Sequence, residues 1–263
     1  MGKSSASRHA GVLIINADDW GRDHETTQRI FECSSRGSIS SVSAMVFMED
    51  SERAAAIARE SAIDAGLHLN FTTPFSVSNG PARLKEFQCK LAAHLRRHRL
   101  AQVIYDPRLT GCFEYLVAAQ IDEFHRLYGA EPKRLDGHHH MHLCANVLWG
   151  RLLPEGAVVR RNFSFRPGEK SLGNRVYRGL IDRMLARRHP IVDFLFSLVP
   201  LEPADRLQGI FSLARHHAVE LETHPVDPEE YEFLGDEVFR RIGDLPIASY
   251  YAHSKMTNEP ASV

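Results

Sequence analysis

Short apolar runs alternate with amphipathic stretches along most of the chain. The run VLII at 12–15 predicts a buried strand, and residues 24–35 predict a helix that stops at Gly37. Further strands are predicted at 41–48, 65–71, from 133 onward, and at 157–161, 219–223 and 246–250. Further helices are predicted near 52–58, 86–100, 113–128, 143–153, 175–189, 203–215 and 228–242. This alternation predicts an α/β fold: one (β/α) barrel-like domain with mostly parallel strands.

Composition narrows the class of protein. The chain has 263 residues, 43% of them hydrophobic and 25% charged, which is typical of a globular protein. A (β/α) barrel uses about 250 residues. The formal net charge of −1 lacks the basic excess of general nucleic-acid binders, so we expect no nucleic-acid partner. The four cysteines stand far apart without a CxxC pair, which argues against a cysteine zinc site.

The ends of the chain suggest its location. Residues 1–10 are polar and lack the apolar core of a secretory signal, so we expect a flexible leader there. No apolar run reaches about 18 residues, so no stable membrane insertion is expected. We therefore predict a cytoplasmic protein with one folded domain over 11–252 and a flexible tail over 253–263.

Polar residues gather where predicted strands end. Asp18 and Asp19 end the first strand, and His68 lies on the polar face of the strand at 65–71. His138 follows a later strand, and His224 ends the strand at 219–223. In parallel α/β folds the carboxyl ends of strands lie on one side, so these groups can converge.

This combination of residues suits metal chemistry. One Asp oxygen and two His nitrogens leave coordination positions open for water and substrate. A second carboxylate beside the ligand can act as a base, and the pair Asp18–Asp19 supplies one. Each of these residues alone also fits a structural role. An Asp pair can cap a helix, and a histidine in a strand can be hydrogen-bonded in the core.

The segment DGHHHMH at 136–142 does not by itself choose a ligand. A strand would place His138, His140 and His142 on one face, whereas a helix would pair only His138 with His142. Both geometries stay open, as does a solvated loop.

Together these motifs resemble the family of YdjC-like carbohydrate deacetylases, which includes chitooligosaccharide and hopanoid-associated deacetylases. The matching segments are LIINADDWG (13–21), GSISSVSAM (37–45), GLHLNFT (66–72), RLDGHHHMH (134–142) and LETHP (221–225). Residues 73–130 and 162–215 match no motif, and substrate choice is expected to depend on them.

The resemblance implies a role for each candidate at the strand ends. Asp19, His68 and His138 would bind one divalent metal ion, Asp18 would be the base, and His224 an acid or oxyanion partner. The ion would be magnesium or zinc, and two His ligands favour zinc or another transition metal. We leave the metal unassigned.

Four further residues are predicted to contact substrate. Trp20 stands where the family usually has Phe, and its ring would suit stacking on a sugar. His140 and His142 are expected near the metal ligands or the substrate, whereas His139 is expected to point away and to be structural. Arg160, in the strand at 157–161, completes the substrate-binding set.

The resemblance therefore makes 11–252 a metal-dependent deacetylase domain. It would hydrolyse an N-acetyl group from an amino sugar, oligosaccharide or glycosylated small molecule, using a metal-bound water and an Asp base. Another metal hydrolase, such as a phosphoesterase or amidohydrolase, is the first alternative, although an amidohydrolase would show HxH where this chain has DD. A His-rich metal-binding protein is the non-enzyme alternative. The oligomeric state stays open, with a homodimer among the options.

Overall fold

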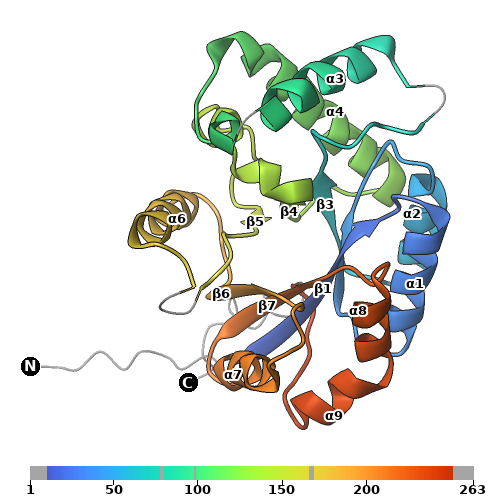
Figure 1. The fold of residues 1–263 in the computed structure, drawn as a ribbon. Coiled ribbons are helices and arrows are strands. Elements are labelled where there is room, and N and C mark those ends of the chain that lie inside the picture. Colours follow the sequence, from blue (N-terminus) through green and yellow to red (C-terminus); the bar gives the residue numbers. More distant parts are fainter. Residues whose placement is uncertain (1–10, 78–79, 98, 166–168, 251–263) are drawn as a thin grey trace, which may run out of the picture.

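Seven parallel strands form one curled sheet, an open half-barrel that positions the rest of the chain (Figure 1). The computed structural model describes residues 11–77, 80–97, 99–165 and 169–250. The strands are β1 (Val12–Trp20), β2 (Ser41–Ala44), β3 (Ala65–Leu69), β4 (Arg134–Gly137), β5 (Val158–Val159), β6 (Phe194–Ser197) and β7 (Ala218–Thr223). Their order is β5-β4-β3-β2-β1-β7-β6, so the predicted barrel-like α/β class is confirmed.

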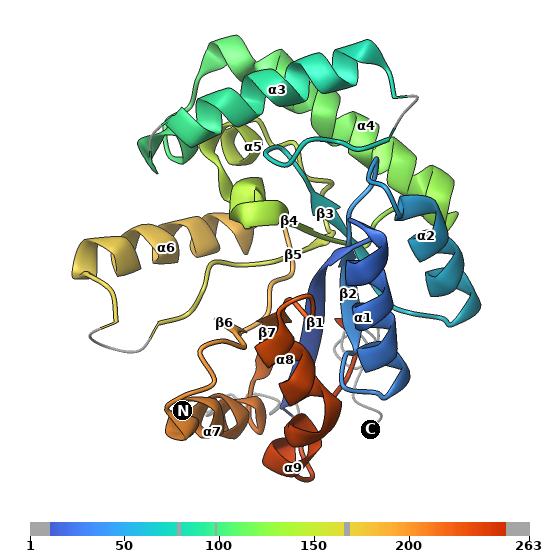
Figure 2. The same cartoon turned by 45° about the vertical axis from the view of Figure 1, so that its right-hand side comes forward.

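Helices follow most strands and pack around the outside of this sheet. They are α1 (His24–Ser35), α2 (Ser51–Glu60), α3 (Ala82–Arg97), α4 (Thr110–Tyr128), α5 (Ala145–Trp149), α6 (Leu172–Leu185), α7 (Ala204–Ala214), α8 (Pro228–Glu232) and α9 (Val238–Ile242). In Figures 1 and 2, α1 and α2 lie beside β1 and β2, α3 and α4 lie together beyond β3, and α6 stands apart from the other helices.

The alternation of side chains along β1 divides the interior into two parts. Leu13, Ile15 and Ala17 belong to the main apolar core, which the outer helices share. Val12 and Ile14 point to the other face, where they form a small apolar cluster. Further along that inner face the side chains become polar. Along β1 the inner face is therefore apolar near the amino end of the strand and charged near its carboxyl end.

Several predicted elements differ from the structure. The strand predicted at 246–250 is wrong, because only a single bridge joins Ile247 to Leu13. Strand β6 was not predicted, since the run FLFS is short and lies among other apolar residues. The helix predicted at 228–242 is interrupted by a π turn over Phe233–Glu237. The predicted leader and the tail at 253–263 lie outside the described residues.

No helix in the described part of the chain combines the length and apolar character needed to span a membrane.

Candidate active site

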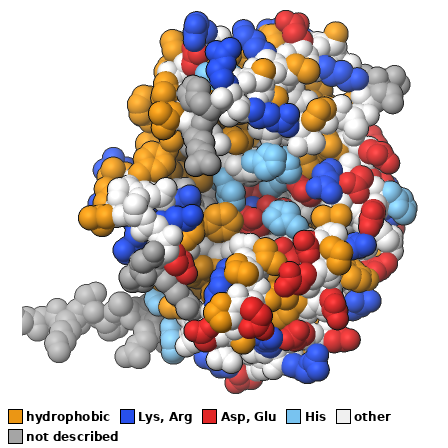
Figure 3. All heavy atoms as spheres, viewed as in Figure 1, with side chains coloured by type: hydrophobic (Ala, Val, Ile, Leu, Met, Phe, Trp, Pro, Cys, Tyr) orange, Lys and Arg blue, Asp and Glu red, His pale blue; other side chains and the backbone are white. Residues whose placement is uncertain are grey.

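The three predicted metal ligands meet at the carboxyl ends of β1, β3 and β4. Oδ1 of Asp19 lies 2.9 Å from Nδ1 of His138 and 3.5 Å from Nε2 of His68. One ligand atom from each of these three residues lies within 4.8 Å of the others. Figure 3 shows histidine side chains in a hollow of this face with acidic side chains beside them. The arrangement has the donors and the spacing of a metal-binding group.

A break in the regularity of β1 brings Asp19 to this face. Successive side chains of a regular strand point to opposite faces, which would separate Asp19 from Asp18. The pairing of β1 with β2 shifts register between Ala17 and Trp20, and Asp19 has a φ of 68°. This left-handed conformation is uncommon outside glycine, and Asp is one of the residues that tolerate it best. Both carboxylates therefore approach His68, with Oδ2 of Asp18 at 3.9 Å from its Nε2.

The two oxygens of Asp19 have different surroundings. Oδ2 accepts a hydrogen bond of 2.7 Å from the Arg22 guanidinium. Oδ1 is buried and faces the two imidazoles without a well-aligned hydrogen bond. Burial would raise the pKa of Asp19, but His138 and His68 outweigh it and hold that pKa well below the usual range. Oδ1 of Asp19 is thus a buried anionic oxygen between two ring nitrogens, which is the environment of a carboxylate oxygen that binds a metal ion. Asp19, His68 and His138 therefore suit a divalent ion.

His68 is oriented from behind by Asp136, a residue for which the sequence predicted no role. Its Nδ1 lies 2.7 Å from Oδ1 of Asp136, so Nε2 is the nitrogen that faces Asp19. Carboxylates commonly orient metal-binding imidazoles in this way. Burial alone would lower the pKa of His68, but Asp18 and Asp136 raise it to about 10. Metal binding at Nε2 would therefore have to displace a proton.

A single buried guanidinium joins the carboxylates beneath the site. Arg160 binds both oxygens of Asp18, at 2.7 and 2.6 Å. It also lies 2.8 Å from Glu220, 3.1 Å from Glu222 and 3.1 Å from Asp136. Arg160 is only 1% exposed and contacts all four of these acidic side chains, of which Asp136 also pairs with the buried Arg134 at 2.9 Å.

The other side of the hollow is formed by β7 and the residue after it. Asp18, Glu222 and His224 offer ligand atoms within 4.8 Å of one another, so His224 does approach the predicted base. Nε2 of His140 lies 3.2 Å from Oε2 of Glu222. Burial would raise the pKa of Glu222, but His140 and Arg160 lower it. The Glu222 position could have been found from VELET, where Glu220 and Glu222 alternate with apolar residues.

Most of the predicted substrate contacts are buried. Trp20 has no exposed surface and packs in the main core, so it presents no face to a sugar. His142 is also buried, and its Nε2 lies 2.9 Å from the carbonyl oxygen of Arg160. Three of the four predicted substrate contacts, Trp20, His142 and Arg160, are thus buried in this structure. His140, whose side chain is 26% exposed, does reach the hollow.

The run of histidines is neither a strand nor a regular helix. Residues His138–Leu143 form 3₁₀ turns, and His139 and His140 have φ angles of 55° and 56°. This kinked backbone brings the rings of His138 and His139 to a centroid distance of 4.0 Å and turns His140 toward Glu222. Nδ1 of His139 lies 3.0 Å from the Thr72 hydroxyl, whereas His138 faces Asp19 and His140 faces Glu222.

Glu230 beneath His224 gives a testable pH dependence. Its Oε2 accepts a 2.6 Å hydrogen bond from the backbone N–H of His224, and burial raises the pKa of Glu230 from 4.5 to about 7. The folded protein therefore retains this proton between about pH 4.5 and 7, and stability falls as pH rises through that window.

We expect Glu230→Gln to remove this loss, because glutamine still accepts the hydrogen bond but does not titrate. From pH 5 to pH 8 the free energy of unfolding of the variant should rise by about 2.5 kcal/mol relative to that of wild type. Urea unfolding at both pH values measures this. Parallel pH dependence of the two proteins would show that Glu230 does not titrate differently on folding.

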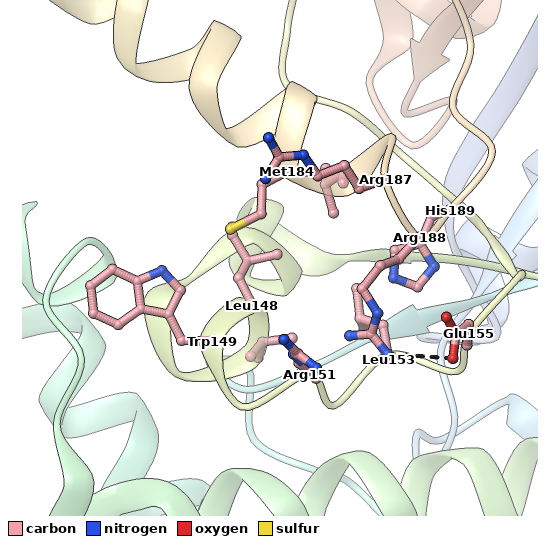
Figure 4. Close-up of a pocket in the computed structure, with 11 residues that line it drawn as sticks. Leu148, Trp149, Arg151, Leu153, Glu155, Met184, Arg187, Arg188 and His189 are labelled. Carbon is pink, nitrogen blue, oxygen red and sulfur yellow. Dashed lines mark ion pairs between the residues drawn. The ribbon is translucent and has the colours of Figure 1, made fainter.

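A second pocket lies away from these residues. It has a volume of about 600 Å³ between α5 and α6, with Trp149, Arg151 and Arg187 among its lining residues. Figure 4 shows these side chains around the pocket, together with the ion pair between Arg188 and Glu155. None of the predicted site residues lines it, so we place the candidate active site at the strand ends.

Comparison with known proteins identifies related sequences and a related fold. A family model described as YdjC-like protein matches residues 12–241. A carbohydrate deacetylase of Danio rerio is 27% identical over 165 residues, which cover 59% of this chain and 50% of that protein. A chitooligosaccharide deacetylase of Enterobacter sp. (strain 638) is 31% identical over 134 residues, 50% of each chain. A carbohydrate deacetylase of Mus musculus is 31% identical over 173 residues, 62% of this chain and 52% of that one.

The chain thus spans about half the length of the curated relatives it matches. Among solved structures, a putative cellobiose-phosphate cleavage protein from Enterococcus faecalis V583 superposes with a TM-score of 0.66 at 18% identity. That match covers 93% of this chain and 99% of the other, and it supports the fold alone.

Proposed function

Because the chain belongs to the YdjC-like protein family, we propose that it hydrolyses an N-acetyl group of an amino sugar or of a sugar-containing small molecule. The observation that carries this proposal is Oδ1 of Asp19, which faces two imidazoles with the Asp18 carboxylate alongside. The relatives named carbohydrate deacetylase and chitooligosaccharide deacetylase support the substrate class.

We propose that Asp19, His68 and His138 hold one divalent ion. Such an ion, when bound, lowers the pKa of a water molecule and polarises the acetyl carbonyl. Two imidazoles and one carboxylate favour zinc or another transition metal over magnesium, and the identity of the metal remains unassigned. Asp136 would hold His68 in the tautomer that keeps Nε2 free for the metal.

Asp18 is the proposed base, because its carboxylate lies beside the metal-binding group without being part of it. Arg160 and the amide of Asn16 fix its orientation, with Asn16 Nδ2 at 2.9 Å from Oδ1. Oδ2 would accept a proton from the attacking water. His224 would supply a proton to the amine nitrogen as the amide bond breaks, which leaves acetate and a free amino sugar.

Asp136→Asn should weaken metal binding while leaving the three ligands in place. Loss of a carboxylate that orients a metal-binding imidazole typically costs about 10–100-fold in affinity or activity. Equilibrium titration of the metal-stripped protein with zinc measures this, with Asp122→Asn on the exposed surface of α4 as a matched control. An unchanged affinity would remove Asp136 from the proposed arrangement.

Acetate release from di-N-acetylchitobiose, with and without a chelator, tests the function. We expect release that stops with chelator and returns when a divalent metal is added back. Activity that persists in a fully metal-stripped protein would contradict the metal-dependent mechanism. Phosphate release from a sugar phosphate without any acetate release would favour the phosphoesterase alternative instead.

A further inference from the structure

The pocket between α5 and α6 combines an exposed aromatic ring with a group of arginines. Its volume of about 600 Å³ is within the range of small-ligand sites. In Figure 4 the arginine side chains lie to one side of the Trp149 ring. The lining thus has an apolar part and a basic part. The apolar part is Leu148, Trp149 and Met184, and the basic part is Arg151, Arg187 and Arg188.

Two of these arginines carry positive charge that no acidic side chain balances. Neither Arg151 nor Arg187 forms an ion pair or a side-chain hydrogen bond with any residue that the structure describes. Glu155, the one acidic residue among the described lining residues, lies 4.0 Å from Arg188, and its side chain is 77% exposed. Positive charge in a hollow with low-dielectric walls attracts anions. The basic part of the pocket therefore suits a ligand with more than one negative charge.

The backbone conformation of Arg151 is a second, independent observation. Helix α5 ends at Trp149, and Arg151, two residues later, has a φ of 53° in the left-handed region. Glycine or asparagine usually follows a helix in this conformation, because a Cβ makes it costly. Residues held in such conformations occur frequently at ligand sites. This chain has an arginine there, and its side chain lines the pocket.

Trp149 offers a flat ring for stacking. Its exposed fraction is 64%, whereas tryptophan is highly buried on average. The ring of Tyr105 lies nearly parallel to it, at 26° with the centroids 6.0 Å apart. Exposed aromatic rings beside positive charge are used to stack nucleobases. A fatty acyl chain would instead need an apolar channel, which a pocket with three arginines in its wall does not provide.

We propose that this pocket binds a nucleoside phosphate, with the base stacked on Trp149 and the phosphates on Arg151 and Arg187. Guanidinium groups bind phosphate oxygens through pairs of charge-assisted hydrogen bonds, which suits them to this role. The proposal is independent of the proposed deacetylase function, because none of the residues of that site lines the pocket.

Titration with ADP, GDP and UDP, followed by tryptophan fluorescence and by calorimetry, tests the proposal. The chain has two tryptophans and Trp20 is fully buried, so a stacked base should quench the emission of Trp149 alone. We expect saturable quenching by at least one of the nucleotides. Adenosine and pyrophosphate, which each lack part of the ligand, should bind at least about tenfold more weakly.

Three variants place the nucleotide in the pocket. Trp149→Ala and Arg187→Gln should each weaken binding about tenfold or more. Arg151→Gly should weaken binding similarly without lowering the Tm, because glycine suits the left-handed backbone. Arg183→Gln, on the exposed surface of α6 outside the pocket, is the matched control and should bind the nucleotide as wild type does.

The contrary outcomes are distinct. No saturable binding of any of the three nucleotides by calorimetry would overturn the proposal, as would pyrophosphate binding as tightly as the nucleotides. An equal loss of affinity in Arg183→Gln would show that binding depends on general positive charge rather than on the pocket. A short single-stranded oligonucleotide that binds more tightly than the nucleotides would assign this surface to nucleic acid instead.

Discussion

Arg160→Met is expected to lower the free energy of unfolding by about 3–5 kcal/mol, the usual cost of removing one partner from a buried ion pair. The guanidinium contacts Asp18, Asp136, Glu220 and Glu222, and it is only 1% exposed. Without it, several acidic groups remain buried with too little positive charge. Methionine fills a similar volume, so the loss reports charge rather than packing.

Urea unfolding of this variant has a matched control in Arg126→Met. Arg126 on α4 also meets two carboxylates, those of Glu52 and Glu123, but its side chain is 54% exposed. Exposed pairs of this kind contribute about 0–1 kcal/mol. If both variants lost the same small amount of unfolding free energy, Arg160 would not stabilise the fold as its contacts indicate.

The second large effect separates Asp18 from Asp19, which are adjacent in the sequence and different in their surroundings. Asp18→Asn should reduce acetate release by about 10²–10⁴-fold, the usual contribution of a general base. Metal should still bind, because Asp19, His68 and His138 are intact, and added metal should not restore the rate.

Asp19→Asn should fail in another way. Its Oδ1 is the oxygen between His68 and His138, so metal affinity should fall and excess metal should restore part of the rate. Metal titration of both variants, followed by acetate release at saturating metal, makes the comparison. Rescue of Asp18→Asn rather than Asp19→Asn would reverse the two roles, and full activity in both would refute the mechanism.

The convergence of the site residues was predictable from the sequence, for a physical reason. Parallel strands end on one side of a sheet, so Asp18, His68, His138 and His224 were expected together despite their separation along the chain. The structure places them there. Alternation within GLHLNF also gave the correct face for His68, because a strand with one apolar face leaves little choice.

The side-chain contacts between neighbouring strands could not be predicted from the sequence. Asp136 lies opposite His68 only because β3 pairs with β4 in that register, and no local pattern specifies the register. Arg160 is equally hard to place: an arginine after a short strand is usually exposed, whereas this one meets carboxylates from three other strands. Trp20 shows the same limit, since its burial depends on the packing of the helices around β1.

The backbone conformation of the histidine segment also could not be predicted from the pattern of residues. Asp136 and Gly137 end strand β4, but neither strand nor regular helix geometry applies to 138–142, because His139 and His140 take left-handed conformations. Such conformations are costly for residues with a Cβ and persist where surrounding contacts impose them. They place the rings of His138 and His139 side by side and turn His140 toward Glu222, which no regular periodicity would do.

The central claim is that Asp19, His68 and His138 together form one metal site. Its most direct test is the number of metal ions bound per chain in wild type and in His68→Ala, by elemental analysis after equilibrium dialysis, with circular dichroism to check the fold. We predict one ion per wild-type chain and essentially none in the variant, whose spectrum should be unchanged. Full occupancy in a folded His68→Ala protein would contradict the claim.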